Sequence, residues 1–268
     1  MNLLEVVESG IPCGWEQVFK DGIYELQDIA KVLWEQEQTY GRFYPDKIDI
    51  FRLFHLIRPE KVRVIIVAQD PYYNMASDGR PEATGVALSV RPGVKIPSSL
   101  QNIHKEIENT VTNWPRPNHG SLESWVHQGV ALLNMSLTVR PGAPASHGKI
   151  WHGFLKRAIN EIFRKRIETP GLKRPQIIIV MWGRDAQGIG QLIDKSYIPL
   201  EAAHPSGRSA HRGFFGCNHF NKVNEHLVAM GDTPIDWTIP PVNYQVYNTM
   251  TPASAGIIQP QPYGGRSL

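Results

Sequence analysis

Four short apolar runs, separated by longer stretches with helical spacing, dominate the hydrophobic pattern of the chain. Runs of this length, rich in β-branched residues and bounded by turn residues, are typical of strands that are buried on both faces of a parallel sheet. We predict such strands at Val62–Ala68, Gly129–Leu133, Gln176–Met181 and Tyr197–Ala203. Apolar residues recur at helical spacing in the stretches 28–40, 48–55, 99–110, 122–127, 152–167, 185–195 and 218–230.

The alternation of these strands and helices predicts an α/β fold. We expect a single domain with a central four-stranded parallel sheet, flanked by helices on both faces. Ser98, followed three residues later by Gln101, predicts a capping box at the start of the helix 99–110.

The chain divides into an N-terminal segment, 1–27, a main domain, 28–237, and a tail, 238–268. The tail is rich in Pro, Gly, Gln and Ser and carries one charged residue, Arg266. This composition is typical of a flexible segment. A docking peptide for a partner is the alternative interpretation of the tail.

Composition limits the class of protein in three ways. Hydrophobic residues are 41% and charged residues 20% of the 268 residues, as in an ordinary globular protein. No apolar run is long enough for a membrane span, and the first residues lack a secretory signal pattern, so we expect an intracellular protein of the cytoplasm or nucleus. The two cysteines, Cys13 and Cys217, exclude a disulfide framework or a four-cysteine cluster within one chain. We expect both to be buried, inert thiols in a reducing compartment.

Polar side chains follow each predicted strand. In open parallel sheets, ligands bind beyond the carboxyl ends of the strands. A carboxamide can read the hydrogen-bonding edge of a base, and Asp and His can perform acid–base or electrostatic work. The residues at these four ends are Gln69, Asp70, Tyr72, Asn134, Arg184 and His204. Alone, Asp70 before Pro71 is an ordinary turn residue, Asn134 a strand-end cap and His204 a satisfied histidine. Their joint placement at one edge favours a site for a planar polar ligand.

Several motifs in this order resemble the uracil-DNA glycosylase family. The family's Gly-Gln-Asp-Pro-Tyr-His motif corresponds to Ala68–Tyr73, AQDPYY, and its uracil-reading strand end to GVALLNMSLTVR, which contains Asn134. Further matches are PSSLQNIHKEI, MWGRDAQ, HPSGRSAHRGFFGCNHF and the Ile-Asp-Trp at 235–237. The resemblance extends from about residue 28 to Trp237.

The resemblance implies excision of uracil from DNA, which leaves an abasic site and initiates base excision repair. Deoxyuridine is flipped out of the stack into a pocket. There Asn134 reads O4 and N3 of uracil, Tyr72 excludes the methyl group of thymine, and a backbone contact from Gln69 orients the base. The glycosidic bond breaks dissociatively.

Two residues are assigned to the chemistry by this resemblance. His204 stabilises the negative charge on O2, and Asp70 orients the attacking water and favours the cationic sugar. No metal and no organic cofactor are implied. The implied substrate is single- or double-stranded DNA that contains uracil. A proteinaceous uracil-glycosylase inhibitor or a replication protein is an open candidate as a further partner, no membrane is involved, and a monomer is expected.

Phosphate contacts in the family come from small hydroxyl residues on loops, and Ser99 and Ser206 occupy such positions. This sequence departs from the family pattern at four positions. Leu88 replaces a phenylalanine that stacks on uracil, and Arg208 replaces an intercalating leucine. Arg184 replaces a serine near the backbone, and Tyr73 replaces a histidine that approaches a phosphate.

Two of the replacements, Arg208 and Arg184, make the DNA-facing side of the predicted site more cationic, whereas Tyr73 can donate a hydrogen bond but cannot become cationic. With His211 and Arg212, Arg208 makes its loop positively charged, which predicts a steeper dependence of DNA binding on salt. The segment from Tyr73 to Ala83 is also longer than usual. We predict that the basic run 163–174 lies at the opposite edge of the sheet, where cations complement a helix dipole. DNA contact is the alternative interpretation of this run.

Three rival functions compete with excision of uracil. The first is a DNA-binding or polymerase-tethering module on the same fold, with weak or no excision activity. The second is a hydrolase that uses Ser206, His204 and Asp70, which the absence of a G-x-S-x-G elbow disfavours. The third is a relative that excises uracil from mismatches alone, which Tyr72 and Asn134 disfavour.

Overall fold

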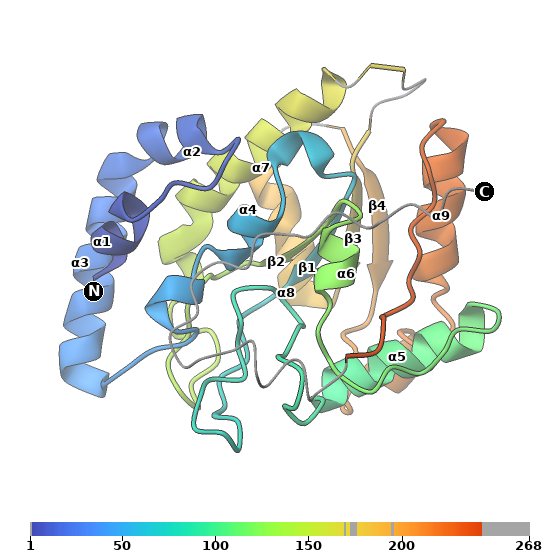
Figure 1. Ribbon diagram of the computed structural model, residues 1–268, viewed down its shortest axis with the longest axis horizontal. Coiled ribbons are helices and arrows are strands. Elements are labelled where there is room, and N and C mark those ends of the chain that lie inside the picture. The colour runs from blue at the N-terminus through green and yellow to red at the C-terminus, as the bar shows by residue number, and fades with distance from the viewer. Residues whose placement is uncertain (1, 169, 172–175, 194–195, 243–268) are drawn as a thin grey trace.

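The core of the fold is a four-stranded parallel sheet in the order β2-β1-β3-β4 (Figure 1). The computed structural model describes residues 2–168, 170–171, 176–193 and 196–242. The strands are β1 (Val64–Ala68), β2 (Val130–Asn134), β3 (Ile178–Trp182) and β4 (Ile198–Ala202). This arrangement confirms the predicted parallel sheet with flanking helices. Each strand lies within the predicted apolar run or ends one residue beyond it.

Burial explains why these segments are strands, with one exception. All residues of β1, β2 and β3 are buried, as a parallel sheet covered on both faces requires. In β4, Leu200 is buried but Pro199 and Glu201 are exposed. The prediction of a fourth fully buried strand was therefore wrong. β4 pairs with β3 alone, and such an edge strand can carry a proline and a charge.

Helices lie on both sides of the sheet in Figure 1, with α3 and α7 on one side and α5 and α9 on the other. The α-helices are α1 (Leu3–Glu8), α2 (Glu16–Asp21), α3 (Ile23–Tyr40), α4 (Arg52–Leu56), α5 (Ser98–Thr110), α6 (Glu123–Val126), α7 (His152–Ile167), α8 (Arg184–Gln187) and α9 (His219–Ala229). The 3-10 helices are η1 (Lys47–Asp49), η2 (Pro59–Lys61), η3 (Gly148–Trp151), η4 (Gly188–Leu192) and η5 (Ala210–Arg212). No helix in the described ranges is long and apolar enough to cross a membrane.

The predicted capping box at Ser98 is wrong. Ser98 is already the first residue of α5, and the cap is Pro97, which makes no side-chain cap bond. Gln101 donates instead from Nε2 to the carbonyl of Ile96, at 2.7 Å. The extended backbone of Pro97 starts the helix one residue earlier than the serine pattern indicated.

The N-terminal segment packs into the same core as the sheet. Leu3, Val7 and Val18 are buried there, and Phe19 meets Phe154 of α7 edge to face at 5.2 Å between ring centroids. In Figure 1, α1 and α2 lie beside α3. Cys13, which we expected to be buried, is exposed, because it lies in the loop between α1 and α2.

The residues after α9 return across the domain. The carbonyl of Trp237 accepts bonds from the indoles of Trp114, at 2.8 Å, and Trp125, at 3.0 Å. Ile239 is buried, and the His119 ring bonds the carbonyl of Pro240 at 2.8 Å. The packed chain therefore extends into the first residues of the segment predicted to be a tail. Residues 243–268 lie outside the described residues.

Cations of the basic run 163–174 are engaged in ion pairs at the far edge of the sheet. Arg166 is almost fully buried and binds Asp232 at 2.7 Å, and Arg63 binds the other oxygen of this carboxylate at 2.8 Å. Arg164 pairs with Glu161 of its own helix and with Glu168, the residue that caps the end of that helix. These pairs fit the structural interpretation of the run, part of which lies outside the described residues.

Candidate active site

The in-register parallel pairing brings the ends of β1 and β2 together. Ala68 is the register partner of Asn134, and the ladder continues one step beyond the strands. Met135 donates its N–H to the carbonyl of Ala68 at 2.8 Å, and Ser136 donates to that of Gln69 at 3.1 Å. Gln69 and Asn134, which are 65 positions apart in the sequence, are thereby held at neighbouring positions of one sheet edge.

A backbone amide from a distant loop anchors Asp70. The N–H of Ala145 donates to Oδ2 at 2.7 Å, and Ala145 has a left-handed backbone, with φ of 60°. Burial raises the pKa of Asp70, the Ala145 bond opposes this, and the charge of Asp185 raises it further. Among the described residues, no group donates a hydrogen bond to Oδ1, so this oxygen is free to accept one.

Asn134 places an unpaired acceptor at the same edge. The residue is 5% exposed, and its Oδ1 is buried without a hydrogen-bond partner among the described residues. Buried polar atoms are almost always paired, because a missing bond costs about 1–3 kcal/mol. Such an orphan acceptor is suited to a ligand that brings an N–H donor.

Tyr72 joins two other parts of the site. Its hydroxyl donates to the carbonyl of Leu88 at 3.2 Å and lies 3.3 Å from Oγ of Ser99 at the start of α5. Burial raises the pKa of the Tyr72 phenol, so the ring stays neutral. Leu88 is buried and has φ of 65°, an unusual value for a leucine. The phenol therefore holds a strained turn and the start of α5 at fixed positions.

Backbone hydrogen bonding determines which nitrogen of His204 carries the proton. The N–H of Ser206 donates to Nδ1 at 3.0 Å, so the neutral ring carries its hydrogen on Nε2. Burial lowers the pKa of His204, although the charge of Asp185 opposes this. A Cβ added to Gly183 would lie 2.9 Å from Cβ of His204, and Gly183 has φ of 93°. Only glycine allows this close approach.

The loop after His204 carries the predicted DNA contacts. Oγ of Ser209 donates to the carbonyl of His204 at 2.8 Å and lies 2.8 Å from Oγ of Ser206. Arg208, His211 and Arg212 are exposed. Ser206 is thus engaged by Ser209 and by its own turn, and its hydroxyl is not bonded to His204. This geometry argues against the Ser-His-Asp hydrolase.

The two remaining predicted contacts, Arg184 and Tyr73, are also exposed. Arg184 is the first residue of α8, directly after β3, and Tyr73 is 39% exposed. Tyr73 precedes the longer segment, in which Met75 and Pro81 form an antiparallel bridge around the turn at Gly79. The long segment is therefore a compact hairpin.

Asp185 is a charged residue of this edge that the sequence analysis did not single out. It lies in α8, just beyond β3, and β3 is adjacent to the strand that leads to Asp70 and to the strand that leads to His204. Its charge acts on both groups. Its position three residues after the end of β3 was a usable signal, but a charge at a helix start is also an ordinary dipole partner.

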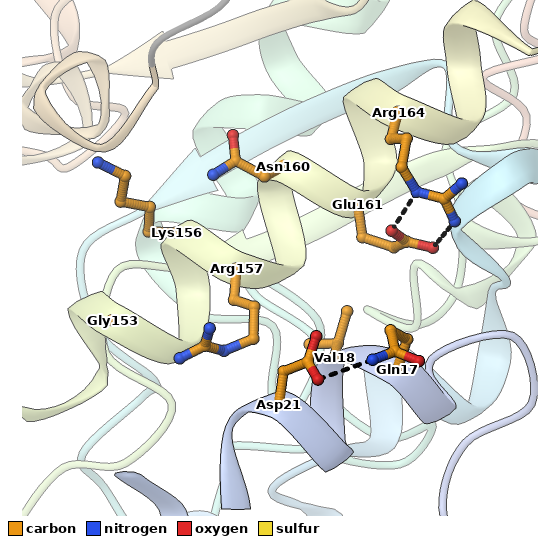
Figure 2. Close-up of a pocket in the computed structure, with 9 residues that line it drawn as sticks. All are labelled: Gln17, Val18, Asp21, Gly153, Lys156, Arg157, Asn160, Glu161 and Arg164. Carbon is orange, nitrogen blue, oxygen red and sulfur yellow. Dashed lines mark hydrogen bonds and ion pairs between the residues drawn. The ribbon is translucent and has the colours of Figure 1, made fainter.

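A hollow of about 440 Å³ lies elsewhere, between α2 and α7 (Figure 2). Several polar side chains of its lining are already bonded, and Arg157 pairs with Glu25 outside the lining. Arg164 binds Glu161 at 2.7 Å, and Gln17 binds Asp21 at 2.7 Å (Figure 2). Within the described ranges, no group of three or more His, Cys, Asp or Glu side chains could hold a metal ion.

Both the sequence and the fold of the chain are similar to those of known proteins. The family model of the uracil DNA glycosylase superfamily matches residues 54–228. The uracil-DNA glycosylase of Escherichia coli K12 is 44% identical over 214 residues, which are 79% of this chain and 86% of that protein.

Solved structures agree with the sequence relatives. The crystal structure of mimivirus uracil-DNA glycosylase matches with a TM-score of 0.77 at 25% identity, over 89% of this chain and 90% of that chain. A variant of mimivirus UNG in complex with UGI matches with a TM-score of 0.77 at 25% identity, over 89% and 92% of the two chains. The UNG of Nitratifractor salsuginis, at 19% identity and a TM-score of 0.55 over 85% and 94%, shares the fold.

The position of Asp185 yields a prediction about pH. Asp185→Asn removes a negative charge that favours the neutral form of Asp70 and the cationic form of His204, so both pKa values should fall. NMR titration of the Asp70 carboxyl carbon and the His204 ring measures this. Asp78→Asn, in the exposed hairpin, is the control and should leave both unchanged. An unaltered Asp70 pKa in the Asp185 variant would show that the two carboxylates do not interact.

Proposed function

The chain belongs to the uracil DNA glycosylase superfamily, and we propose that the side chains at its carboxyl sheet edge carry out the family's reaction. The function is that of a uracil-DNA glycosylase, a monofunctional hydrolase that cleaves the N-glycosidic bond of deoxyuridine in DNA. It releases uracil, leaves an abasic site and so begins base excision repair. The assignment of individual residues to steps is our proposal.

Base recognition is assigned to Asn134. The observation that carries this proposal is the buried Oδ1 without a partner among the described residues. Uracil supplies N3–H to this oxygen and O4 to the amide Nδ2–H of the same side chain. Cytosine presents an acceptor at N3 and a donor at its amino group, so both bonds would be lost. Tyr72, fixed through its hydroxyl, stands beside C5 and excludes the methyl group of thymine.

Departure of the base is assigned to His204. As the bond between C1′ and N1 breaks, its electron pair passes to the uracil ring and negative charge collects on O2. The Nε2–H of the neutral imidazole donates to that oxygen, because Ser206 occupies Nδ1. A fixed donor in a site that excludes water stabilises such an anion strongly. Burial supports the neutral form, since it lowers the pKa of His204.

Attack by water is assigned to Asp70. Ala145 fixes Oδ2, and Oδ1 is left to accept a hydrogen bond from the nucleophilic water. The negative charge of Asp70 also stabilises the cationic sugar before the water attacks. The water oxygen then bonds to C1′, and its proton passes to the carboxylate. The backbone of Gln69 supports the uracil base, and the side chain of Leu88 packs on the face of the base.

DNA contacts are assigned to the residues that surround this edge. Ser99 and Ser206 approach phosphates, and the stem of Arg208 fills the gap that the flipped nucleotide leaves in the duplex. Arg184, His211, Arg212 and Tyr73 add exposed donors around it. Both single- and double-stranded DNA are proposed substrates.

Partners and location form a further part of the proposal. A DNA substrate implies an intracellular location, in the cytoplasm or a nucleus. Because mimivirus UNG forms a complex with UGI, a proteinaceous inhibitor is a candidate partner of this chain. A replication protein is another candidate, and we propose that the enzyme acts as a monomer.

Excision is tested directly with oligonucleotides that carry one deoxyuridine. We expect release of uracil, but not of thymine or cytosine, from single and double strands without added metal. Asp70→Asn and His204→Leu should each lower kcat by roughly 100- to 10,000-fold, with unchanged urea unfolding. Alkaline cleavage at abasic sites measures the product. A wild-type protein that binds DNA but releases no uracil would instead indicate a tethering module.

Leu88→Phe should lower KM for the uracil substrate several-fold. Stacking of a base on an aromatic ring is worth about 1–3 kcal/mol, and leucine offers apolar contact without the π-face. Leu88→Met, similar in volume and without a ring, is the matched control and should leave KM unchanged. Steady-state kinetics measure KM for the wild type and both variants. An unchanged or higher KM for the phenylalanine variant would contradict a stacking position for residue 88.

Arg208→Ala should make DNA binding less sensitive to salt. Loss of one phosphate contact lowers the slope of log K against log salt by about 1. The measurement uses the Asp70→Asn background, in which we expect the substrate to be consumed too slowly to affect a binding measurement. Arg164→Ala, at the far edge of the sheet, should leave the slope as it is. The same slope in the Arg208 variant would remove this side chain from the interface.

A further inference from the structure

Helix α5 presents a row of polar residues to the segment 205–221, which follows His204 directly. Ser99, Asn102, Glu106 and Thr110 follow one another at intervals of three and four residues, so they share one face of the helix. Ser99 contacts the Tyr72 hydroxyl, as described above. The next three members of the row all contact the segment 205–221.

Asn102 contacts the turn directly after His204. Its Nδ2 donates to the carbonyl of Pro205 at 2.7 Å. This carbonyl shares a peptide group with the N–H of Ser206, and that N–H fixes the imidazole of His204. A side chain on α5 therefore controls the position of the group that sets the orientation of His204.

Glu106 holds the other end of the same loop. Its side chain is fully buried, and its two oxygens accept the N–H of Gly216 at 2.7 Å and that of Asn218 at 3.0 Å. Asn218 precedes α9 and has φ of 58°, with no side-chain cap of its own. A buried carboxylate thus replaces the cap of α9 and is stabilised by the positive end of that helix.

The surroundings of Glu106 are consistent with this role. The thiol of Cys217 lies 3.7 Å from Oε1, and burial raises its pKa to about 11, so the thiol remains neutral beside the carboxylate. One turn further along α5, the carbonyl of Thr110 accepts Nδ2 of Asn221 at 2.7 Å. The loop 204–218 is consequently tied to α5 at both ends, and its exposed residues, Arg208 among them, lie between the ties.

We propose that Asn102 and Glu106 are positioning residues for uracil excision, which set the loop 204–218 and through it the imidazole of His204. The proposal rests on the role of His204 in the proposed function. Neither side chain is placed in contact with DNA or with the base. Both act by presenting a fixed hydrogen-bond partner to backbone groups of the loop.

The experiment uses two nearly isosteric variants of the full chain. Asn102→Asp replaces a donor by an acceptor opposite the Pro205 carbonyl, and Glu106→Gln replaces one accepting oxygen by an amide. Each should lower kcat for uracil excision about 10-fold and leave KM nearly unchanged. The reason is that a misplaced His204 stabilises the transition state less well but does not alter the binding of the substrate. Glu108→Gln makes the same chemical change on the exposed side of α5 and should have no effect.

A double-mutant cycle separates positioning from a merely structural role. In the His204→Leu background the imidazole is absent, so the same two substitutions should cost about 2-fold or less. A 10-fold loss that persists in that background, or a lowered melting temperature with unchanged kcat, would overturn the proposal. If Glu106→Gln fails to fold, the Asn102 cycle decides alone. A wild-type protein without excision activity would refute the proposed function itself, and this proposal with it.

Discussion

Parallel pairing of the strands is the constraint on which the site depends. Because all four strands run in one direction, their carboxyl ends meet at one edge, and the register of Ala68 with Asn134 aligns two of these ends to the residue. The complete burial of β1, β2 and β3 makes this register difficult to shift, since a shift would displace the apolar side chains that fill the core. Strand pairing thereby places the polar residues that follow each strand at the same edge of the sheet, without any need for them to contact one another.

Backbone amides set the chemical state of the groups that converge there. Burial disfavours the charged forms of both Asp70 and His204, and a carboxylate and an imidazole respond to this with pKa shifts in opposite directions. The N–H of Ala145 counters the effect at Asp70, and the N–H of Ser206 selects the tautomer at His204. Main-chain donors are suited to this task, because they carry no net charge and cannot titrate.

The extent to which the sequence could anticipate the structure depended on the range of the interactions involved. The strands and the helix 152–167 follow from the local hydrophobic pattern. The motifs at the strand ends supply Asp70, Tyr72, Asn134 and His204 as the residues of the proposed site. The capping box at Ser98 failed because backbone at Pro97 decided the helix start. The exposure of β4 and of Cys13, the charge of Asp185 beside two other groups, and the burial of Glu106 all depend on neighbours distant in the chain. Pattern alone does not reveal such neighbours.

The bond from the Tyr72 hydroxyl ends on the main-chain carbonyl of residue 88 rather than on its side chain. In the proposed site, the rejection of thymine by Tyr72 is consequently independent of which side chain residue 88 carries. Substitution of residue 88, in evolution or in protein engineering, could therefore change the side-chain contact with the base without altering discrimination at C5. Affinity and fidelity are in this way separately adjustable properties of a single turn.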